Sequence, residues 1–312
     1  MKSVIRILFL GGAKRFSVAQ RLIESGEQLN LKIEIFSYEI GFHHPISDIA
    51  TIVPGKLFSD PDAKIHIELI LKEKSIDIAL PFHDKSISII SSLSHLVFVP
   101  TCSEELVKIF NSKKESASFF RKNSIPVPLY SEKVPVIAKP DFGSASQGLL
   151  RFSEQHLLDE FLKSDDRTNF EIQELFSGPE YSVDGYIALN SEFSHFAVRE
   201  RLEVLGGEVS KSKTVEIREI EEYCIQLSKI IGVKGAITIQ FIYDDKANQY
   251  GIMEVNARYG GGMLTSYGAG VPWFKILLRD FLKLEQEKVV QKNNFLMIRS
   301  FREHYFQLQS GQ

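Results

Sequence analysis

Three polar side chains alternate along one apolar segment late in the chain. Glu254, Asn256 and Arg258 stand two positions apart within the stretch 252–258. In an extended strand, residues two apart project to the same face. Carboxylate and amide oxygens side by side suit Mg²⁺ as ligands, and an arginine in the same row can stabilise a transferring phosphoryl group. The alternative is a solvated face of an edge strand.

A fourth candidate lies on the preceding apolar segment. Gln240 falls within 237–242, and the polar stretch 244–248 separates that segment from the next. A hairpin about this turn brings Gln240 close to Glu254, because the midpoint of the two positions falls inside the turn. An ordinary surface glutamine is the alternative. The spacing therefore predicts a divalent-cation site formed by Gln240, Glu254 and Asn256.

A lysine at the end of a strand offers a second kind of chemistry. Lys139 closes the apolar stretch 134–139, and a loop of small residues at 143–148, which includes Ser144, comes soon after it. A lysine in this position can reach phosphate oxygens, and the loop amides can add donors. Many lysines at strand ends are simply solvated, so the prediction of phosphate binding by Lys139 depends on the neighbouring loop.

The stretch 173–180 has the composition of a hinge between two lobes. It contains the turn Gly178-Pro179, followed by Glu180. Backbone groups of such a hinge can bond to the edge of an adenine, while Glu180 can accept from ribose hydroxyls. A glycine-proline turn is also common as a turn and nothing more.

The elements that must position these side chains change character along the sequence. Strand-like segments at 4–10, 31–38, 76–80 and 96–99 enclose helical patterns, as in an open parallel α/β domain. A helix is predicted over 104–123, ending before the prolines at 126 and 128. The remaining elements are predicted strands at 134–139, 149–152, 170–175, 180–189, 193–202, 235–243 and 250–255, with helices at 156–162, 220–231 and 273–284. The predicted fold class is therefore α/β followed by α+β.

The first glycine turn gives little support for dinucleotide binding. Gly11-Gly12 follows the first strand, but position 16 is Phe16, so the pattern GxGxxG is absent. A tight strand-to-helix turn is the favoured interpretation.

Composition narrows the class of protein. The chain has 312 residues, a net charge of −3, 44% hydrophobic and 25% charged residues, and two cysteines. These values favour a soluble globular protein without a nucleic-acid surface or a disulfide scaffold. No apolar run approaches the roughly 20 residues that span a bilayer. We expect a cytoplasmic protein without a membrane partner.

Taken in order, the motifs resemble the ATP-grasp superfamily, and within it the carbamoyl-phosphate synthase large-chain type of module. The resemblance is carried by Lys113, Pro126 and Pro128, Lys139-Pro140, the stretch 173–180, Gln240 and the stretch 254–258. It implies a pre-ATP-grasp α/β domain at 1–103, then a two-lobed ATP-grasp fold. The small lobe with linking helices would cover 104–176, and the C-terminal lobe with the metal site would cover 177–312.

The resemblance also implies roles for individual residues. Lys113, Lys139 and the loop with Ser144 would bind the phosphates. Adenine would be bound by Gln173, Glu174 and Phe176, and the ribose by Glu180. One or two Mg²⁺ (or Mn²⁺) ions fall to Gln240, Glu254 and Asn256. Arg258 would contact the γ-phosphate or the acyl-phosphate, and Lys213, or alternatively Lys211, would be a further phosphate-binding lysine. Arg199 and Arg201 would bind an anionic substrate.

The activity implied is an ATP-dependent carboxylate–amine (or ammonia) ligase that works through an acyl-phosphate and releases ADP and phosphate. An amino acid is the first expectation for the carboxylate, and a homodimer is the default assembly. The alternatives are a non-catalytic ATP-binding sensor and a dinucleotide-dependent oxidoreductase. The sequence departs from the family pattern in three respects: Ser112 precedes Lys113 where aspartate is usual, the phosphate loop has two glycines, and one ATP-grasp unit is present instead of two.

Overall fold

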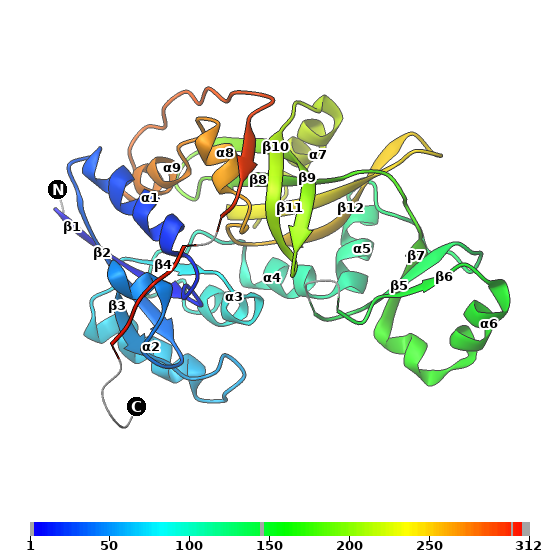
Figure 1. The fold of residues 1–312 in the computed structure, drawn as a ribbon, viewed down its shortest axis with the longest axis horizontal. Coiled ribbons are helices and arrows are strands. Elements are labelled where there is room, and N and C mark those ends of the chain that lie inside the picture. Colours follow the sequence, from blue (N-terminus) through cyan, green and yellow to red (C-terminus); the bar gives the residue numbers. More distant parts are fainter. Residues whose placement is uncertain (1–2, 144–146, 301, 308–312) are drawn as a thin grey trace.

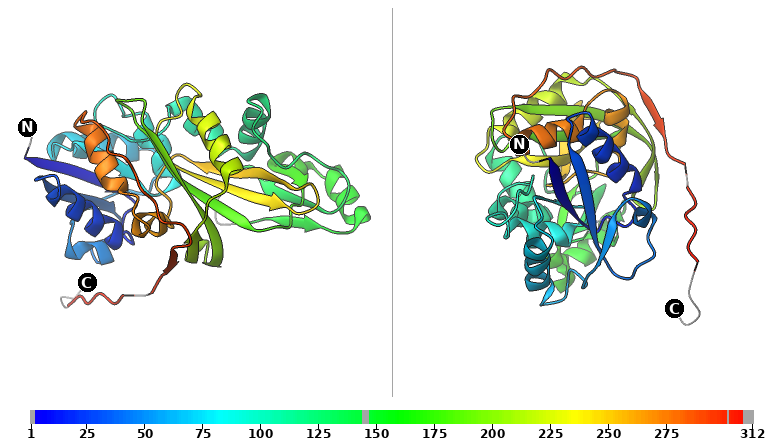
Figure 2. Two further views of the ribbon diagram at one scale, coloured as in Figure 1. Left: turned by 90° about the horizontal axis from the view of Figure 1, so that it is seen from above. Right: turned by 90° about the vertical axis from the view of Figure 1, so that its left-hand side faces the viewer.

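The computed structural model describes residues 3–143, 147–300 and 302–307. Within these residues, three β-sheets follow one another along the long axis of the molecule (Figures 1 and 2). The N-terminal sheet lies at one end and the smallest sheet at the other, with the largest between them. The mixed α/β architecture agrees with the predicted fold class.

The N-terminal sheet is parallel, with strand order β3-β2-β1-β4. Along β1, Ile5 and Ile7 enter one hydrophobic cluster with α1, whereas Leu8 and Leu10 enter another with α2. Both faces are thus covered, which explains the continuous apolar run. The predicted strand at 96–99 makes only an isolated bridge. The elements are β1 (Val4–Leu10), α1 (Phe16–Glu27), β2 (Lys32–Glu39), η1 (Pro45–Asp48), β3 (Thr51–Pro54), α2 (Ala63–Glu73), β4 (Ile78–Pro81) and α3 (Asp84–Ser91).

The predicted helix over 104–123 is wrong at one position, where the chain breaks into two helices. These are α4 (Glu104–Asn111) and α5 (Lys113–Lys122), and Ser112 between them has an extended backbone with φ −100° and ψ 125°. The Ser112 hydroxyl accepts from the amide of Glu115 at 3.1 Å and donates to Asp141 at 2.7 Å. A serine that caps a new helix ends the preceding one, and this outweighs the continuous helical pattern.

The central sheet is antiparallel, with strand order β12-β11-β8-β9-β10-β13. One face packs against α4, α5 and α7 through a cluster that includes Leu106, Val183, Leu227 and Ile239. The opposite face carries polar side chains and is described below. The elements are β8 (Glu180–Ile187), β9 (Ser194–Leu205), β10 (Glu208–Thr214), α7 (Arg218–Ser228), β11 (Gly235–Asp244), β12 (Gln249–Asn256) and β13 (Leu296–Ile298).

The small sheet has strand order β6-β5-β7 and packs on a helix through Val136, Ala138, Leu158 and Ile172. Its elements are β5 (Val136–Pro140), β6 (Leu150–Phe152), α6 (Gln155–Lys163), η2 (Asp165–Asn169) and β7 (Phe170–Glu174). Residues 175–179 connect β7 to β8, so the predicted hinge lies between the two sheets.

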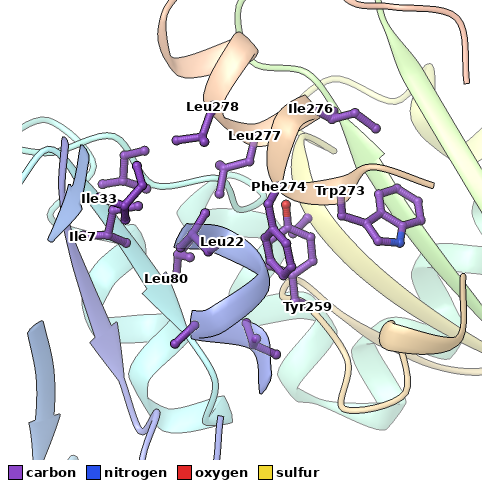
Figure 3. Packing of buried hydrophobic residues seen from close by; sticks show 14 of the residues in the cluster. Ile7, Leu22, Ile33, Leu80, Tyr259, Trp273, Phe274, Ile276, Leu277 and Leu278 are labelled. Carbon is purple, nitrogen blue, oxygen red and sulfur yellow. The ribbon is translucent and has the colours of Figure 1, made fainter. Parts of the chain in front are cut away.

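The end of the chain returns to the first domain. Helices α8 (Leu264–Gly268) and α9 (Trp273–Phe281) follow the central sheet. Figure 3 shows Phe274 and Leu277 of α9 packed beside Leu22 of α1, in a cluster that joins both ends of the chain. Further on, Arg302 lies over the ring of Phe16, 4.3 Å from its centroid. Among the described residues, none of the helices is long and apolar enough to cross a membrane.

Candidate functional site

The hairpin of β11 and β12 gathers the predicted cation ligands on one face of the central sheet. Its register sets Gln240 opposite Glu254, and Thr238 opposite Asn256. The side-chain amide of Asn256 donates to Glu254 Oε1 at 2.8 Å. The three oxygen-bearing side chains therefore form one group, as the predicted hairpin requires.

A β-bulge alters which residues of β12 reach this face. The register shifts after Gln240, so that Phe241 pairs with Ile252 and Met253 is left as an extra residue. Two residues of a bulged strand then oppose one of its partner, and both Met253 and Glu254 line the adjoining cleft. Simple alternation along the sequence did not indicate Met253.

A cleft of about 160 Å³ separates the central sheet from the small sheet. Many of the predicted site residues line it: the nucleotide contacts Lys113, Lys139, Glu174, Phe176 and Glu180, the cation ligands Gln240 and Glu254, and the substrate contact Arg201. Gln173 does not; it is buried behind the wall and its amide donates to Glu171 at 3.4 Å. Ser144 lies outside the described residues.

Two lysines concentrate positive charge at one end of the cleft. Burial lowers the pKa of Lys139 from its ordinary 10.5 to about 8, although the charge of Glu254 acts in the opposite direction. Burial also lowers the pKa of Lys113, again opposed by Glu254. Two partly desolvated ammonium groups favour binding of a polyanion, because its charge would offset the cost of their burial.

The start of α5 holds Lys113 close to Gly143, where the predicted phosphate-binding loop begins. The amide of Lys113 donates to the carbonyl of Asp141 at 3.0 Å, and the amide of Lys114 donates to the Asp141 carboxylate at 3.0 Å. The Lys113 ammonium donates to the carbonyl of Gly143 at 2.9 Å. The serine that replaces the usual aspartate at position 112 therefore acts as the cap that orients this lysine.

Another part of the cleft is apolar. It is lined by Pro128, Ile137, Leu175, Phe176, Ile242 and Met253, of which only Phe176 was predicted from the sequence. Phe176 packs on Gly251, where an added Cβ would lie 2.9 Å from its ring. Apolar side chains that line a cleft suit a flat heterocycle.

The hinge itself is held by backbone contacts. The amide of Gly178 donates to the carbonyl of Tyr243 at 3.0 Å, and a Cβ at position 178 would lie 2.4 Å from that oxygen. The carboxylate of Glu174 accepts from the amide of Leu129 at 2.8 Å. Close approach to β11 thus requires glycine at this turn.

Two of the predicted arginines reach the oxygen-bearing row. Arg201 donates to Gln240 Oε1 at 2.9 Å and lies 3.6 Å from Glu180. Arg258 donates twice to Asp84 Oδ1, at 2.9 and 2.7 Å. Asp84 begins α3 in the first domain, so that domain orients Arg258. Sequence spacing gave no role to Asp84, because the pair is 174 positions apart.

Lys213 is not brought to this site. It lies opposite Glu200 on β9 and forms an ion pair with it at 3.1 Å. Its neighbour Ser212 pairs with Arg201, so alternation along β10 directs Lys213 to the other face of the sheet. The alternative, Lys211, does not line the cleft either.

The glycine turn of the first domain bonds within the domain. Backbone amides of Gly12 and Ala13 donate to the buried carboxylate of Glu39, whose pKa is raised by burial. A Cβ at Gly12 would lie 2.7 Å from Phe9. These contacts support the interpretation of a tight turn.

A second cavity continues from the cleft. Its volume is about 390 Å³, and it shares Arg201, Gln240 and Glu254 with the cleft. Further in, it is lined by Arg15, Ser182, Arg199, Glu208, Asn256, Arg258 and the glycines 260–262. Glu254 therefore lies where the cleft meets a polar cavity.

The oxygen donors fit a hard cation that brings further ligands with it. No group of three His, Cys, Asp or Glu side chains suited to a metal occurs in the described part of the chain. Glu254 supplies the one carboxylate of the predicted set, and Gln240 and Asn256 supply neutral amides. Mg²⁺ is usually held by one or two carboxylates together with phosphates and water, so this donor set suits a cation that arrives with a polyphosphate.

Comparison with known proteins agrees with this geometry. Residues 167–303 match the family described as "ATP-grasp in the biosynthetic pathway with Ter operon". A search among curated proteins found no match.

Several solved structures share the fold. An L-amino acid ligase from Bacillus licheniformis has a TM-score of 0.68 and 16% identity, covering 93% of this chain and 76% of its own. The N5-carboxyaminoimidazole synthetase of Staphylococcus aureus with ADP has a TM-score of 0.73 and 15% identity, covering 93% and 81%. The biotin carboxylase of Campylobacter jejuni has a TM-score of 0.72 and 15% identity, covering 92% and 73%.

Proposed function

We propose that this chain, of which residues 167–303 match an ATP-grasp family, is an ATP- and Mg²⁺-dependent ligase of the ATP-grasp superfamily that joins a small carboxylate to an amine or ammonia. One observation carries the proposal: two desolvated lysines and a row of oxygen ligands meet at Glu254, in a cleft that is also lined by apolar side chains. ATP requires both of these features, because its base needs an apolar surface and its phosphates need positive charge and a cation.

Each part of the cleft then has a task. The apolar part of the cleft holds adenine, and Glu180, which follows the hinge directly, accepts from ribose hydroxyls. Lys113 and Lys139 hold phosphates. Gln240, Glu254 and Asn256 would hold Mg²⁺, which neutralises charge on the phosphoryl oxygens. The residues that were predicted to bind nucleotide thus stay together in the proposal, apart from Gln173 and from Ser144, which lies outside the described residues.

The reaction proceeds in two displacements. The substrate carboxylate attacks the γ-phosphorus of ATP, the bond to the β,γ-bridging oxygen breaks, and an acyl-phosphate and ADP form. An amine or ammonia then attacks the acyl carbon, losing a proton, and inorganic phosphate leaves. No nucleophile from the chain is required, so its residues act by positioning and charge stabilisation.

Arg258 is the residue best suited to the transferring group. Asp84 holds its guanidinium at the boundary between the first domain and the central sheet, and the side chain lines the polar cavity close to Asn256. A fixed guanidinium costs little reorganisation when charge develops on the phosphoryl oxygens. Lys213, which pairs with Glu200, has no part in this scheme.

The names of the similar structures support a carboxylate-activating reaction. One of them is an L-amino acid ligase, which favours an amino acid as the carboxylate of this chain too. The finer likeness to a carbamoyl-phosphate synthase module, the homodimer and the cytoplasmic location stay predictions.

Release of ADP tests the proposal. Pairs of small carboxylates and amines, with amino acids first, are incubated with Mg·ATP, and ADP is measured. We expect release that needs both substrates and is lost in Glu254→Gln. Binding of ATP without release for any pair would support a sensor instead. Binding of NAD(P) in place of ATP would support an oxidoreductase.

A further inference from the structure

The polar cavity contains a buried arginine with an unused donor. The Arg199 side chain is 2% exposed, and its Nη1 has no hydrogen-bond partner among the described residues. Leaving a buried charged donor without an acceptor is costly. Because Arg199 lines the cavity, a ligand in that cavity can supply the missing acceptor.

The remaining nitrogens of Arg199 are firmly held. Nε and Nη2 donate to the two oxygens of Asp184, at 3.0 and 3.2 Å. Asp184 also accepts from Ser266 at 2.8 Å, and Trp273 donates to Ser266 at 2.9 Å. The guanidinium therefore has a fixed position, with its Nη1 amino group left without an acceptor, and this is the state of a donor that is organised before its ligand arrives.

The glycine run 260–262 explains why no side chain competes for this donor. A Cβ at Gly262 would lie 2.5 Å from the Arg199 guanidinium. At Gly261 it would lie 2.9 Å from Glu208 and 3.3 Å from Arg15. The backbone thus forms one wall of the cavity against these three charged side chains, and the space beyond stays open.

The position of Arg199 in the cavity separates it from the phosphate end. Arg201, Gln240 and Glu254 line both the cleft and the cavity, whereas Arg199 lines the cavity alone. Arg199 lies opposite Ser182, which lies opposite Gln240, which lies opposite Glu254. This row crosses three strand spacings, so the Cα atoms of Arg199 and Glu254 are about 14 Å apart. The reacting carboxylate must stay near Glu254, and Arg199 is left for another part of the substrate.

Arg15 closes the far side of the same cavity from the first domain. It donates to Glu208 at 2.9 and 3.3 Å, and Arg299 donates to Glu208 at 2.7 Å. Two arginines thus neutralise the one carboxylate at this end, which removes its repulsion for an anion.

From these contacts we infer that the substrate is a small acid with a second carboxylate, and that the free Nη1 of Arg199 binds this second carboxylate in the polar cavity. The inference rests on the proposed ligase function for the role of the first carboxylate. Substrate selection by the cavity follows directly, because an uncharged amide in place of the second carboxylate would form a weaker bond with a guanidinium.

Matched acids test the inference. Succinate, glutarate and adipate are each compared with the corresponding monoamide, at constant ionic strength. Binding to the protein without nucleotide is measured by calorimetry, and ADP release is measured with Mg·ATP and ammonia. At least one diacid should bind about tenfold or more tightly than its monoamide, as a charge-assisted hydrogen bond implies.

Three variants locate the effect. Arg199→Lys keeps a positive charge for Asp184 but lacks the planar fork that serves two partners at once, so the diacid preference should fall to about one. Arg15→Gln should weaken the preference in part. Arg279→Gln is the matched control: both arginines have side chains 18% exposed and pair with one glutamate at 2.8–2.9 Å, but Arg279 pairs with Glu287 outside the cavity. Its preference should equal that of the wild type.

The outcomes separate the two proposals. The inference about Arg199 is overturned by any of three results: diacids and monoamides bind equally, no diacid binds, or Arg199→Lys keeps the preference for diacids. This holds whether or not the protein turns over ATP. Failure to bind Mg·ATP or release ADP overturns the ligase proposal. Because acid binding is measured without nucleotide, it still decides the role of Arg199 in that case. The melting temperature of Arg199→Lys checks that the variant is folded.

Discussion

Replacing Lys139 with methionine should make the nucleotide-free protein more stable while abolishing ATP binding. Lys139 lies on β5 with Glu254 and Lys113 as charged neighbours, and burial opposes its charge. Methionine has a similar length and no charge, so it keeps the packing and removes the desolvation penalty. A residue that weakens the fold to prepare a binding site is a common compromise between stability and function.

The magnitude follows from the pKa. A fall from 10.5 to about 8 for the Lys139 ammonium corresponds to about 3 kcal/mol, because a tenfold change in an equilibrium is about 1.4 kcal/mol. The depressed pKa means that the folded protein resists protonation, so this penalty is fully present below pH 8. It diminishes as the pH rises toward 10.5. Since partial hydration of the site reduces it, we expect a gain of about 1–3 kcal/mol at pH 7.

Urea denaturation at pH 7, with and without Mg·ATP, measures both effects. Wild type should be stabilised by Mg·ATP, and Lys139→Met should be more stable than wild type without nucleotide but indifferent to it. Lys163→Met, at the exposed end of α6, controls for the added methionine. The reasoning about Lys139 is refuted if Lys139→Met is less stable than wild type in the absence of nucleotide, or if Mg·ATP stabilises it to the same extent.

Three other perturbations test separate parts of the site. The dissociation constant of Mg·ATP, measured by calorimetry, should be constant below about pH 8 and rise about tenfold per pH unit above it, because phosphates bind the protonated form of Lys139; Lys139→Arg should flatten this profile. Asp84→Ala frees Arg258 and should lower kcat for ADP release about tenfold or more while leaving ATP affinity within about twofold, and an unchanged kcat would argue against a positioning role. Gly178→Val would force its Cβ, 2.4 Å from the Tyr243 carbonyl, to move the hinge, and should cost about 2 kcal/mol or more in urea unfolding.

The fold and the centre of the site could be predicted because they depend on local signals. Alternation placed Glu254 and Asn256 on one face, and the polar turn placed Gln240 opposite Glu254. Glycines and prolines marked the boundaries of most elements. Signals of this kind lie within a few residues of one another, so one sequence is enough to show them.

The contacts that the sequence did not show depend on register or on distant elements. Lys213 resembled other phosphate-binding candidates, but the pairing of β10 with β9 directs it to the opposite face. A bulge adds Met253 to the lining of the cleft, and the position of the bulge could not be predicted from the residue types. Asp84 and Arg15 reach the site from the first domain through tertiary packing alone. The break at Ser112 had a local signal, since serine is a favoured helix cap.

Titration of wild type with ATP in the presence of Mg²⁺ or of a chelator, repeated in Glu254→Gln, tests the central claim most directly. Glu200→Gln is the matched control, because Glu200 lies on the same sheet, opposite Lys213 and away from the cleft. We predict that wild type and Glu200→Gln bind Mg·ATP, and that either chelation or Glu254→Gln weakens binding at least tenfold. Affinity that is equal with and without the cation and unaffected by Glu254→Gln, or no binding to wild type at all, would contradict the account.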